Sequence, residues 1–247
     1  MPHPEWFESW FGSPYYHILY EQRDDEEAEA FADALLRYLE PARGARMLDI
    51  ACGEGRLSRS LAAHGYDVTG IDLSHASISL AQRSESANLH FFVHDMRMPF
   101  YINYFDLAFN FFTSFGYFAK PRDHRMAARS FAGALKPGGF LVVDYLNRDK
   151  VLAGLVPEET VERGGIVFDI RRRYDGTHFI KEIRFTDRQG AQQHFTERVA
   201  AFGLADFLQL FRKAGLSLVS TFGDYQLKPF HPTDSPRLVM VFKKADG

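Results

Sequence analysis

The chain has 247 residues, 46% of them hydrophobic, which is enough for one sizeable domain, or one domain with an insertion, around a large core. Its formal net charge of −3 argues against a nucleic-acid-binding protein, which needs a basic face. The N-terminal segment has acids and prolines where a signal peptide has a basic start, no apolar stretch reaches the ~20 residues that span a bilayer, and the single cysteine, Cys52, allows no internal disulfide. We therefore expect a cytoplasmic protein with no membrane or nucleic-acid partner.

Helices and strands are predicted to alternate after an irregular, aromatic segment at residues 1–22. The first helix covers 24–40, where the acidic first turn suits the positive end of the helix dipole and Phe31, Leu35 and Leu39 lie on one face. Strands follow at 46–51, 66–73, 89–96, 104–112 and 140–146. Helices separate them at 56–64, 74–85 and 123–135, and the turn "KPGG" ends the last of these. This alternation predicts a parallel sheet covered on both faces.

The pattern changes between residues 158 and 201, where "RGG", "YDGT" and "DRQG" separate runs of alternating residues. These are hairpin signals, and they predict an antiparallel meander. A helix from residue 204 to 211 and strands at 216–222 and 237–244 then close the α/β unit. The predicted division is 1–45 as an N-terminal lid and first helix, 46–150 with 202–247 as the ligand-binding core, and 151–201 as an inserted sheet that covers the substrate or makes a dimer contact.

The segment "MLDIACGEGRLS" runs from a strand through Gly53 and Gly55 into a helix. Such a glycine pair lets a ligand approach the backbone closely, although a tight turn without a ligand would need the same residues. A dinucleotide-binding loop has a third glycine where this chain has Ser58. Glu54 would sit badly beside two phosphates but tolerates a cationic ligand, and Asp49 adds negative charge near the end of the strand.

Two further acids end the next strands. Asp72 lies about 20 positions after Gly53, where a carboxylate accepts hydrogen bonds from ribose hydroxyls. Asp95 ends the third strand, and an adenine amino group is a plausible partner for it. Because the carboxyl ends of parallel strands meet at one edge, Asp49, Asp72 and Asp95 should line one rim. Each acid taken alone could equally be a surface acid or a helix cap.

With this loop and these acids, the chain resembles the class I S-adenosylmethionine-dependent methyltransferases. "LDIACGEG" matches their first motif, "GIDLS" their second-strand acid, "HDM" their adenine-contacting acid and "LKPGG" the turn before their fifth strand. The resemblance covers about residues 47–146, and the last two strands extend it. It implies a Rossmann-like, doubly wound seven-stranded α/β sheet with the antiparallel meander inserted.

The resemblance also implies roles for individual residues. Around the methionine and ribose of the donor it places Asp49, Ala51, Gly53 and Gly55, with Cys52 in the same loop as a small packing residue rather than a reactive thiol. It implies that Asp72 binds the ribose, that Leu73 packs on the adenine, and that Asp95 and Met96 contact the adenine.

The segment "FNFFTSFGYF" leaves the fourth strand at the edge that faces the methyl donor in this family. Many enzymes that methylate nucleic-acid bases or protein glutamine have Asn/Asp-Pro-Pro-Tyr/Phe here, and this chain has "NFFT", which speaks against those substrates. The resemblance makes Asn110 the expected contact to the methionine end of the donor. Ser114, Phe115 and Tyr117 are candidates for the substrate pocket, with plain packing as the alternative.

The N-terminal "SPYYHILYEQRDDEE" is similar to the leading segment of glycine N-methyltransferase-like enzymes. By that similarity Arg23 would pair with the donor carboxylate, with Tyr15 or Tyr20 nearby, unless Arg23 makes an exposed ion pair with a neighbouring acid.

The expected function is methyl transfer from S-adenosylmethionine to a small molecule by in-line displacement, with S-adenosylhomocysteine as product and a possible homodimer. No catalytic residue and no metal site is predicted, and the acceptor atom stays open among N, O and C. The alternatives are an NAD-dependent oxidoreductase and a non-catalytic protein that binds S-adenosylmethionine.

Overall fold

The computed structural model describes residues 5–20 and 25–246, so Arg23 lies outside the described residues. A seven-stranded sheet forms the centre of the molecule, with the strand order β10-β11-β5-β4-β1-β2-β3. Its strands are β1 Arg46–Ile50, β2 Asp67–Asp72, β3 Leu89–Val93, β4 Phe105–Asn110, β5 Leu135–Leu146, β10 Leu216–Phe222 and β11 Arg237–Lys244. Strands β1 to β5 pair in parallel, and β11 pairs antiparallel with both β5 and β10. This confirms the predicted Rossmann-like α/β sheet.

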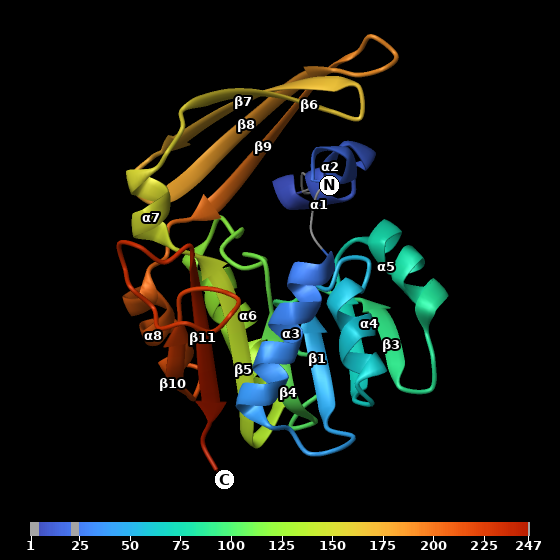
Figure 1. The fold of residues 1–247 in the computed structure, drawn as a ribbon, viewed down its shortest axis with the longest axis vertical. Helices are drawn as coiled ribbons and strands as arrows, with labels where there is room; N and C mark the ends of the chain where they lie inside the picture. The colour runs from blue at the N-terminus through green and yellow to red at the C-terminus, as the bar shows by residue number, and fades with distance from the viewer. Residues whose placement is uncertain (1–4, 21–24, 247) are drawn as a thin grey trace.

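Helices cover both faces of this sheet (Figure 1). One face packs against α3 Asp25–Leu39, α4 Arg56–Ala63 and α5 His75–Ala81, which the 3₁₀ turn Gln82–Ser84 extends. The other face packs against α6 Pro121–Ala134 and α8 Leu204–Arg212. Phenylalanines such as Phe31, Phe131 and Phe211 are fully buried in these layers, and each buried ring stabilises the fold by about 2 kcal/mol.

The insertion forms a separate antiparallel sheet, as predicted, in the order β6-β7-β8-β9. Its strands are β6 Glu158–Arg163, β7 Ile166–Tyr174, β8 His178–Thr186 and β9 Gln192–Ala200, and a short helix, α7 Arg148–Ala153, precedes them. Figure 1 shows the N-terminal helices α1 Trp6–Phe11 and α2 Pro14–Leu19 between this sheet and the α/β core. Trp10 and Leu19 of these helices share a buried cluster with Phe168, Ile183 and Phe185 of the meander.

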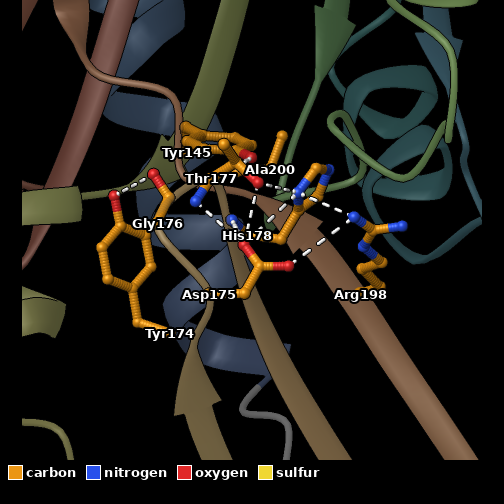
Figure 2. Close-up of polar contacts among 8 residues, drawn as sticks. All are labelled: Tyr145, Tyr174, Asp175, Gly176, Thr177, His178, Arg198 and Ala200. Atoms are coloured by element: carbon orange, nitrogen blue, oxygen red, sulfur yellow. Dashed lines mark hydrogen bonds and ion pairs between the residues drawn. The ribbon is translucent and has the colours of Figure 1, made fainter.

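Polar contacts join the meander to the core at one corner (Figure 2). Ala200, the last residue of β9, accepts a 2.5 Å hydrogen bond from Tyr145 Oη of β5 and donates one of 2.8 Å to the carbonyl of Gly116. Beside them the Asp175 side chain accepts a hydrogen bond from the N–H of His178 at 2.7 Å and pairs with Arg198 at 3.6 Å. The meander is therefore fixed directly to the segment that follows β4.

Three sequence predictions were wrong in detail. Residues 1–22 were expected to be irregular, whereas α1 and α2 form there, with the Ser13 side chain capping α2. The helix α7 was not predicted. The "KPGG" turn lies within the bounds of β5, where Gly138 has φ +76° and the pairing with β4 shifts register. Among the described residues, no helix is long and apolar enough to cross a membrane.

Candidate active site

The glycine loop after β1 is a run of left-handed residues, with φ of +62° at Ala51, +56° at Gly53 and +77° at Gly55. The two glycines are needed for different reasons. A Cβ on Gly55 would collide with the ring of Phe91 on β3. A Cβ on Gly53 would meet no described atom within 4 Å, so this residue borders open space. The loop therefore presents bare backbone at Gly53, as close approach of a ligand requires.

Asp49 lies beneath this loop and is 3% exposed. The Ser58 hydroxyl, on the first turns of α4, donates a 2.6 Å hydrogen bond to Asp49 Oδ2. Ser58 is fully buried, so the serine in the place of a third glycine both packs tightly and partners an acid. Burial raises the pKa of Asp49 to about 6, against the opposing hydrogen bond from Ser58, and the neighbouring charge of Asp72 adds to the rise.

Asp72 joins the glycine loop to the start of α5. Its Oδ2 accepts from the backbone N–H of Gly53 at 2.9 Å, and its Oδ1 accepts from that of Ser74 at 2.8 Å. Burial raises the pKa of Asp72, although these backbone hydrogen bonds oppose the rise. Each carboxylate oxygen still has a lone pair that can accept from a ribose hydroxyl.

Asp95 lies after β3 and is held by Arg97. Arg97 Nε donates to Asp95 Oδ1 at 3.0 Å and Nη2 donates to Asp95 Oδ2 at 2.7 Å, a bidentate pair. Burial alone would raise the pKa of Asp95, but the hydrogen bonds from Arg97 overcome it and leave the pKa below its usual value. Arg97 Nη1 also pairs with Glu5 at 2.7 Å, so Arg97 links the adenine-contact candidate to the residue directly before α1. Leu73 and Met96 are half-buried against the same core.

Asn110, the last residue of β4, is fully buried. Its Nδ2 donates to the Ile50 carbonyl at 3.0 Å, while its Oδ1 has no hydrogen-bond partner among the described residues. A buried amide oxygen without a partner costs free energy, so native proteins rarely keep one unless a ligand or water completes it. Asn110 Oδ1 is therefore a ready acceptor at the edge where β1 and β4 end.

The three substrate-pocket candidates lie in different surroundings. Phe115 is fully buried, and its ring lies about 6 Å from those of Phe131 and Phe211, so it is a core residue under α6 and α8 and not a pocket wall. The Ser114 hydroxyl donates to the Phe111 carbonyl at 2.7 Å. Tyr117 is half-buried and faces the N-terminal helices, with its ring 5.2 Å from that of Trp6.

The helices α1 and α2 touch the donor rim, the edge formed by the glycine loop and the residues that follow β3 and β4, at points that the sequence did not reveal. Trp6 Nε1 donates to the Tyr117 carbonyl at 3.3 Å, and His17 Nδ1 lies 3.3 Å from Glu54 Oε1 of the glycine loop. The sequence predicted a lid here through the similarity of "SPYYHILYEQRDDEE" to the leading segment of glycine N-methyltransferase-like enzymes, but it did not predict these contacts.

The hydroxyls of Tyr15 and Tyr20, which were expected near the donor carboxylate, point toward the meander instead. Tyr15 Oη donates to Asp187 at 3.1 Å, and Tyr20 Oη donates to Glu197 at 2.7 Å, both on the meander side. Cys52 is half-buried in the loop, where burial raises the pKa of its thiol, which suits a packing residue.

Comparisons with known proteins agree with this geometry. A family model described as a methyltransferase domain matches residues 21–221. A glycine/sarcosine N-methyltransferase of Parasynechococcus marenigrum is 27% identical over 81% of this chain and 72% of its own length. A dTDP-3-amino-3,6-dideoxy-alpha-D-glucopyranose N,N-dimethyltransferase of Streptomyces fradiae is 28% identical over 82% of each chain.

Other matches are shorter or more distant. YqeM of Bacillus subtilis is 37% identical, but the match spans only 49% of each chain, about half the length of that relative. The crystal structure of an S-adenosylmethionine-dependent methyltransferase from Clostridium acetobutylicum superposes with a TM-score of 0.79 at 18% identity, over 94% of this chain and 96% of the other. That likeness confirms the fold.

Proposed function

This chain belongs to the methyltransferase-domain family, and from that premise we propose that it transfers the methyl group of S-adenosylmethionine to an amino group of a small molecule. S-adenosylhomocysteine is the second product. The family and the relatives give no support to an NAD-dependent oxidoreductase. A protein that binds the donor without turnover is separated from an enzyme by the experiment below.

The observation that carries the donor assignment is the buried Oδ1 of Asn110, which has no hydrogen-bond partner in the described part of the chain. The α-ammonium group of a methionine donates hydrogen bonds and carries positive charge, so it fits an orphaned acceptor that lies near Asp49. The carboxylates of Asp49 and Asp72 favour a cationic sulfonium nucleoside over a pyrophosphate, because like charges close together in a buried site repel strongly.

We assign the other donor contacts by the part of the molecule that each residue would hold. Ala51, Gly53 and Gly55 border the methionine and ribose, Asp72 binds the ribose hydroxyls, and Leu73, Asp95 and Met96 contact the adenine. The pairing of Arg23 with the donor carboxylate stays a prediction, because that residue lies outside the described part of the chain. Tyr15 and Tyr20 are less suited to this role, since their hydroxyls already bond to the meander.

The donor supplies a methyl group that its positive sulfur has already activated. What the protein adds is alignment and the exclusion of water, which together lower the barrier of a displacement reaction. Asn110 and the two acids hold one side of the site, and the aromatic faces of Trp6 and Tyr117 cover it. An aromatic face near a cation adds about 1 kcal/mol of attraction.

An amino group is the acceptor that the relatives favour. The two relatives described above that match over more than two thirds of their own length are both named as N-methyltransferases, one for glycine and sarcosine and one for an amino sugar. A small amine also fits a site whose cover is built from tryptophan and tyrosine rings. We therefore narrow the acceptor atom from N, O or C to N.

The proposal is tested with labelled donor and matched pairs of acceptors. Glycine and sarcosine are compared with glycolate, and amino sugars with the same sugars bearing hydroxyls, while calorimetry measures binding of S-adenosylmethionine and S-adenosylhomocysteine. We expect transfer to amines alone. Transfer to the hydroxyl compounds alone would contradict the amine acceptor, and tight donor binding without transfer to any compound would favour the non-catalytic alternative.

The remaining assignments concern the whole chain. We propose that residues 1–45 act as lid and first helix, that 151–201 cover the substrate, and that 46–150 with 202–247 bind the donor. The homodimer also stays a prediction, which light scattering checks by the mass in solution. The cytoplasmic location expected from the single cysteine is likewise a prediction.

A further inference from the structure

A buried ion pair lies beside the donor rim and outside the residues assigned above. Asp144, near the end of β5, is fully buried, and Arg237 is the first residue of β11. Arg237 Nε donates to Asp144 Oδ1 at 2.8 Å, and Arg237 Nη2 donates to Asp144 Oδ2 at 2.9 Å. This two-point geometry suits a guanidinium and fixes orientation as well as distance.

The pair lies against a strained turn. Phe112 and Thr113, which lie two and three residues after the end of β4, have φ of +56° and +61°. Neither is glycine, and a β-branched threonine in the left-handed region is an outlier. Such a backbone persists only where its surroundings hold it, and strain of this kind gathers at functional sites.

The ion pair supplies the groups that hold this turn. The N–H of Phe112 donates to Asp144 Oδ2 at 2.7 Å, and the N–H of Thr113 donates to the Asp144 carbonyl at 3.1 Å. Arg237 Nη2 also donates to Thr113 Oγ1 at 2.9 Å. Tyr225 Oη donates a further hydrogen bond to Asp144 Oδ2 at 3.2 Å.

The contacts continue from the turn to the donor rim. Asn110 lies two residues before Phe112, and its side chain bonds to the Ile50 carbonyl at the end of β1. The ring of Phe112 lies 5.1 Å from the Arg56 guanidinium at the start of α4. Since β11, β5, β4 and β1 are neighbours in the sheet, these contacts run across four adjacent strands at one edge.

We propose that Asp144 and Arg237 are positioning residues that hold the Phe112–Thr113 turn in its left-handed form and thereby fix Asn110 for the methionine end of the donor. Only the second part of this inference, the positioning of Asn110 for the donor, rests on the proposed function. In this proposal the pair acts through the turn and not through direct contact with the donor or the acceptor.

The main test compares Arg237→Lys with Lys136→Gln. Arg237→Lys keeps the charge but loses the two-point fork. Lys136→Gln removes another ion pair between β4 and β5 residues, that with Asp106, at the opposite end of these strands. Hydrogen exchange of residues 110–115, the affinity for S-adenosylhomocysteine, and kcat and KM for the donor are measured well below the unfolding temperature.

In Arg237→Lys we expect faster exchange at residues 112 and 113, an affinity for S-adenosylhomocysteine that falls about tenfold or more, and a raised KM for the donor. Lys136→Gln should change none of these. Thr113→Gly removes the strain, so adding it should shrink the loss that Arg237→Lys causes, which a merely structural ion pair would not show. Thr113→Val, which keeps the ion pair and removes only the hydroxyl acceptor, gives a milder variant should Arg237→Lys not fold.

The outcomes separate the two proposals. Unchanged exchange and unchanged affinity in folded Arg237→Lys, or in Thr113→Val if that is the variant used, would overturn the positioning role. Faster exchange in a protein whose wild type binds neither donor nor product would support the hold on the turn and reject the proposed function instead.

Discussion

Gly53 and Gly55 are both left-handed, but a side chain at each would meet different surroundings. We predict that Gly53→Ala remains folded, at a cost of about 1–2 kcal/mol for the left-handed alanine, and loses about tenfold or more in donor affinity. Gly55→Ala should lose more stability because its Cβ would enter the ring of Phe91. Calorimetry and thermal unfolding measure the two effects.

Gly65→Ala is the matched control for this prediction. Gly65 follows α4, has φ +87°, and would also place a Cβ in open space, so it carries the backbone strain without the donor site. Equal donor affinities of Gly53→Ala and Gly65→Ala would show that Gly53 does not border the donor.

The raised pKa of Asp49 predicts a pH dependence of both stability and binding. With a folded pKa of about 6, against 3.8 as the ordinary value, Asp49 favours folding below about pH 4, and this contribution is lost as the pH rises through 6. A cationic donor prefers the ionised acid, so the affinity for S-adenosylmethionine should weaken below pH 6, by at most about tenfold per pH unit. Calorimetry between pH 5 and 8 measures this slope.

Asp49→Asn keeps the shape and an acceptor for Ser58 while removing the titrating charge. In Asp49→Asn we expect the affinity for S-adenosylmethionine to depend less on pH than in the wild type. We also expect its free energy of unfolding to fall less than that of the wild type as the pH rises from 4 to 6. An unchanged slope in Asp49→Asn would assign the titration to another group.

At the scale of elements, α1 carries both tryptophans of the chain, Trp6 and Trp10. Trp6 bonds to the Tyr117 carbonyl at the rim, whereas Trp10 is fully buried and donates to Glu197 on the meander at 2.6 Å. We predict that S-adenosylhomocysteine changes the intrinsic fluorescence, and that Trp6→Phe loses this change while Trp10→Phe keeps it. A titration at fixed protein concentration measures it, and a signal that survives in Trp6→Phe and is lost in Trp10→Phe would show that Trp6 does not border the donor.

The long, periodic elements were predictable because their patterns are local. Two-residue alternation marks β7 and β8, and the apolar faces of α3 and α8 recur every three to four residues. The six-residue helices α1 and α2 were not predictable, since helices so short owe their stability to tertiary packing rather than to propensity.

For the site, too, the sequence predicted what local patterns record and missed what depends on tertiary contacts. Asp49, Asp72 and Asp95 could be placed near one rim because parallel strands end at the same edge of a sheet. The partners of these acids were harder. Arg97 lies only two positions after Asp95, but no sequence pattern shows that its side chain turns back to that acid. Asp144 and Arg237 are also paired, although they lie 93 positions apart in the chain, and a local sequence pattern does not record such a contact. The sequence left pocket wall and plain packing open for Phe115, because a phenylalanine in a rim segment and one in the core look alike in sequence.

At the scale of the whole molecule, α1 and α2 lie between the α/β core and the meander and pack against the meander (Figure 1). In the function proposed above, the core carries the donor residues, and the meander and the N-terminal helices cover them. The core and the meander meet where Ala200 bonds to both Tyr145 and Gly116 (Figure 2). Tyr117, the residue directly after Gly116, packs its ring against Trp6 of α1. Loosening this corner should therefore disturb acceptor binding more than donor binding.

Tyr145→Phe tests this corner, and Tyr174→Phe is its matched control. Tyr145→Phe leaves the Ala200 carbonyl without its side-chain donor in a buried place, at a cost of about 1–3 kcal/mol. Tyr174 also donates to a backbone carbonyl, that of Gly176, but it lies on the exposed hairpin, so its loss should cost less than about 0.5 kcal/mol. We predict that Tyr145→Phe speeds hydrogen exchange at the core end of β9 and raises KM for the acceptor, while the affinity for S-adenosylhomocysteine changes little. If both variants gave the same exchange and the same acceptor KM, the meander would not depend on this corner, and its role as the substrate cover would need a different attachment to the core.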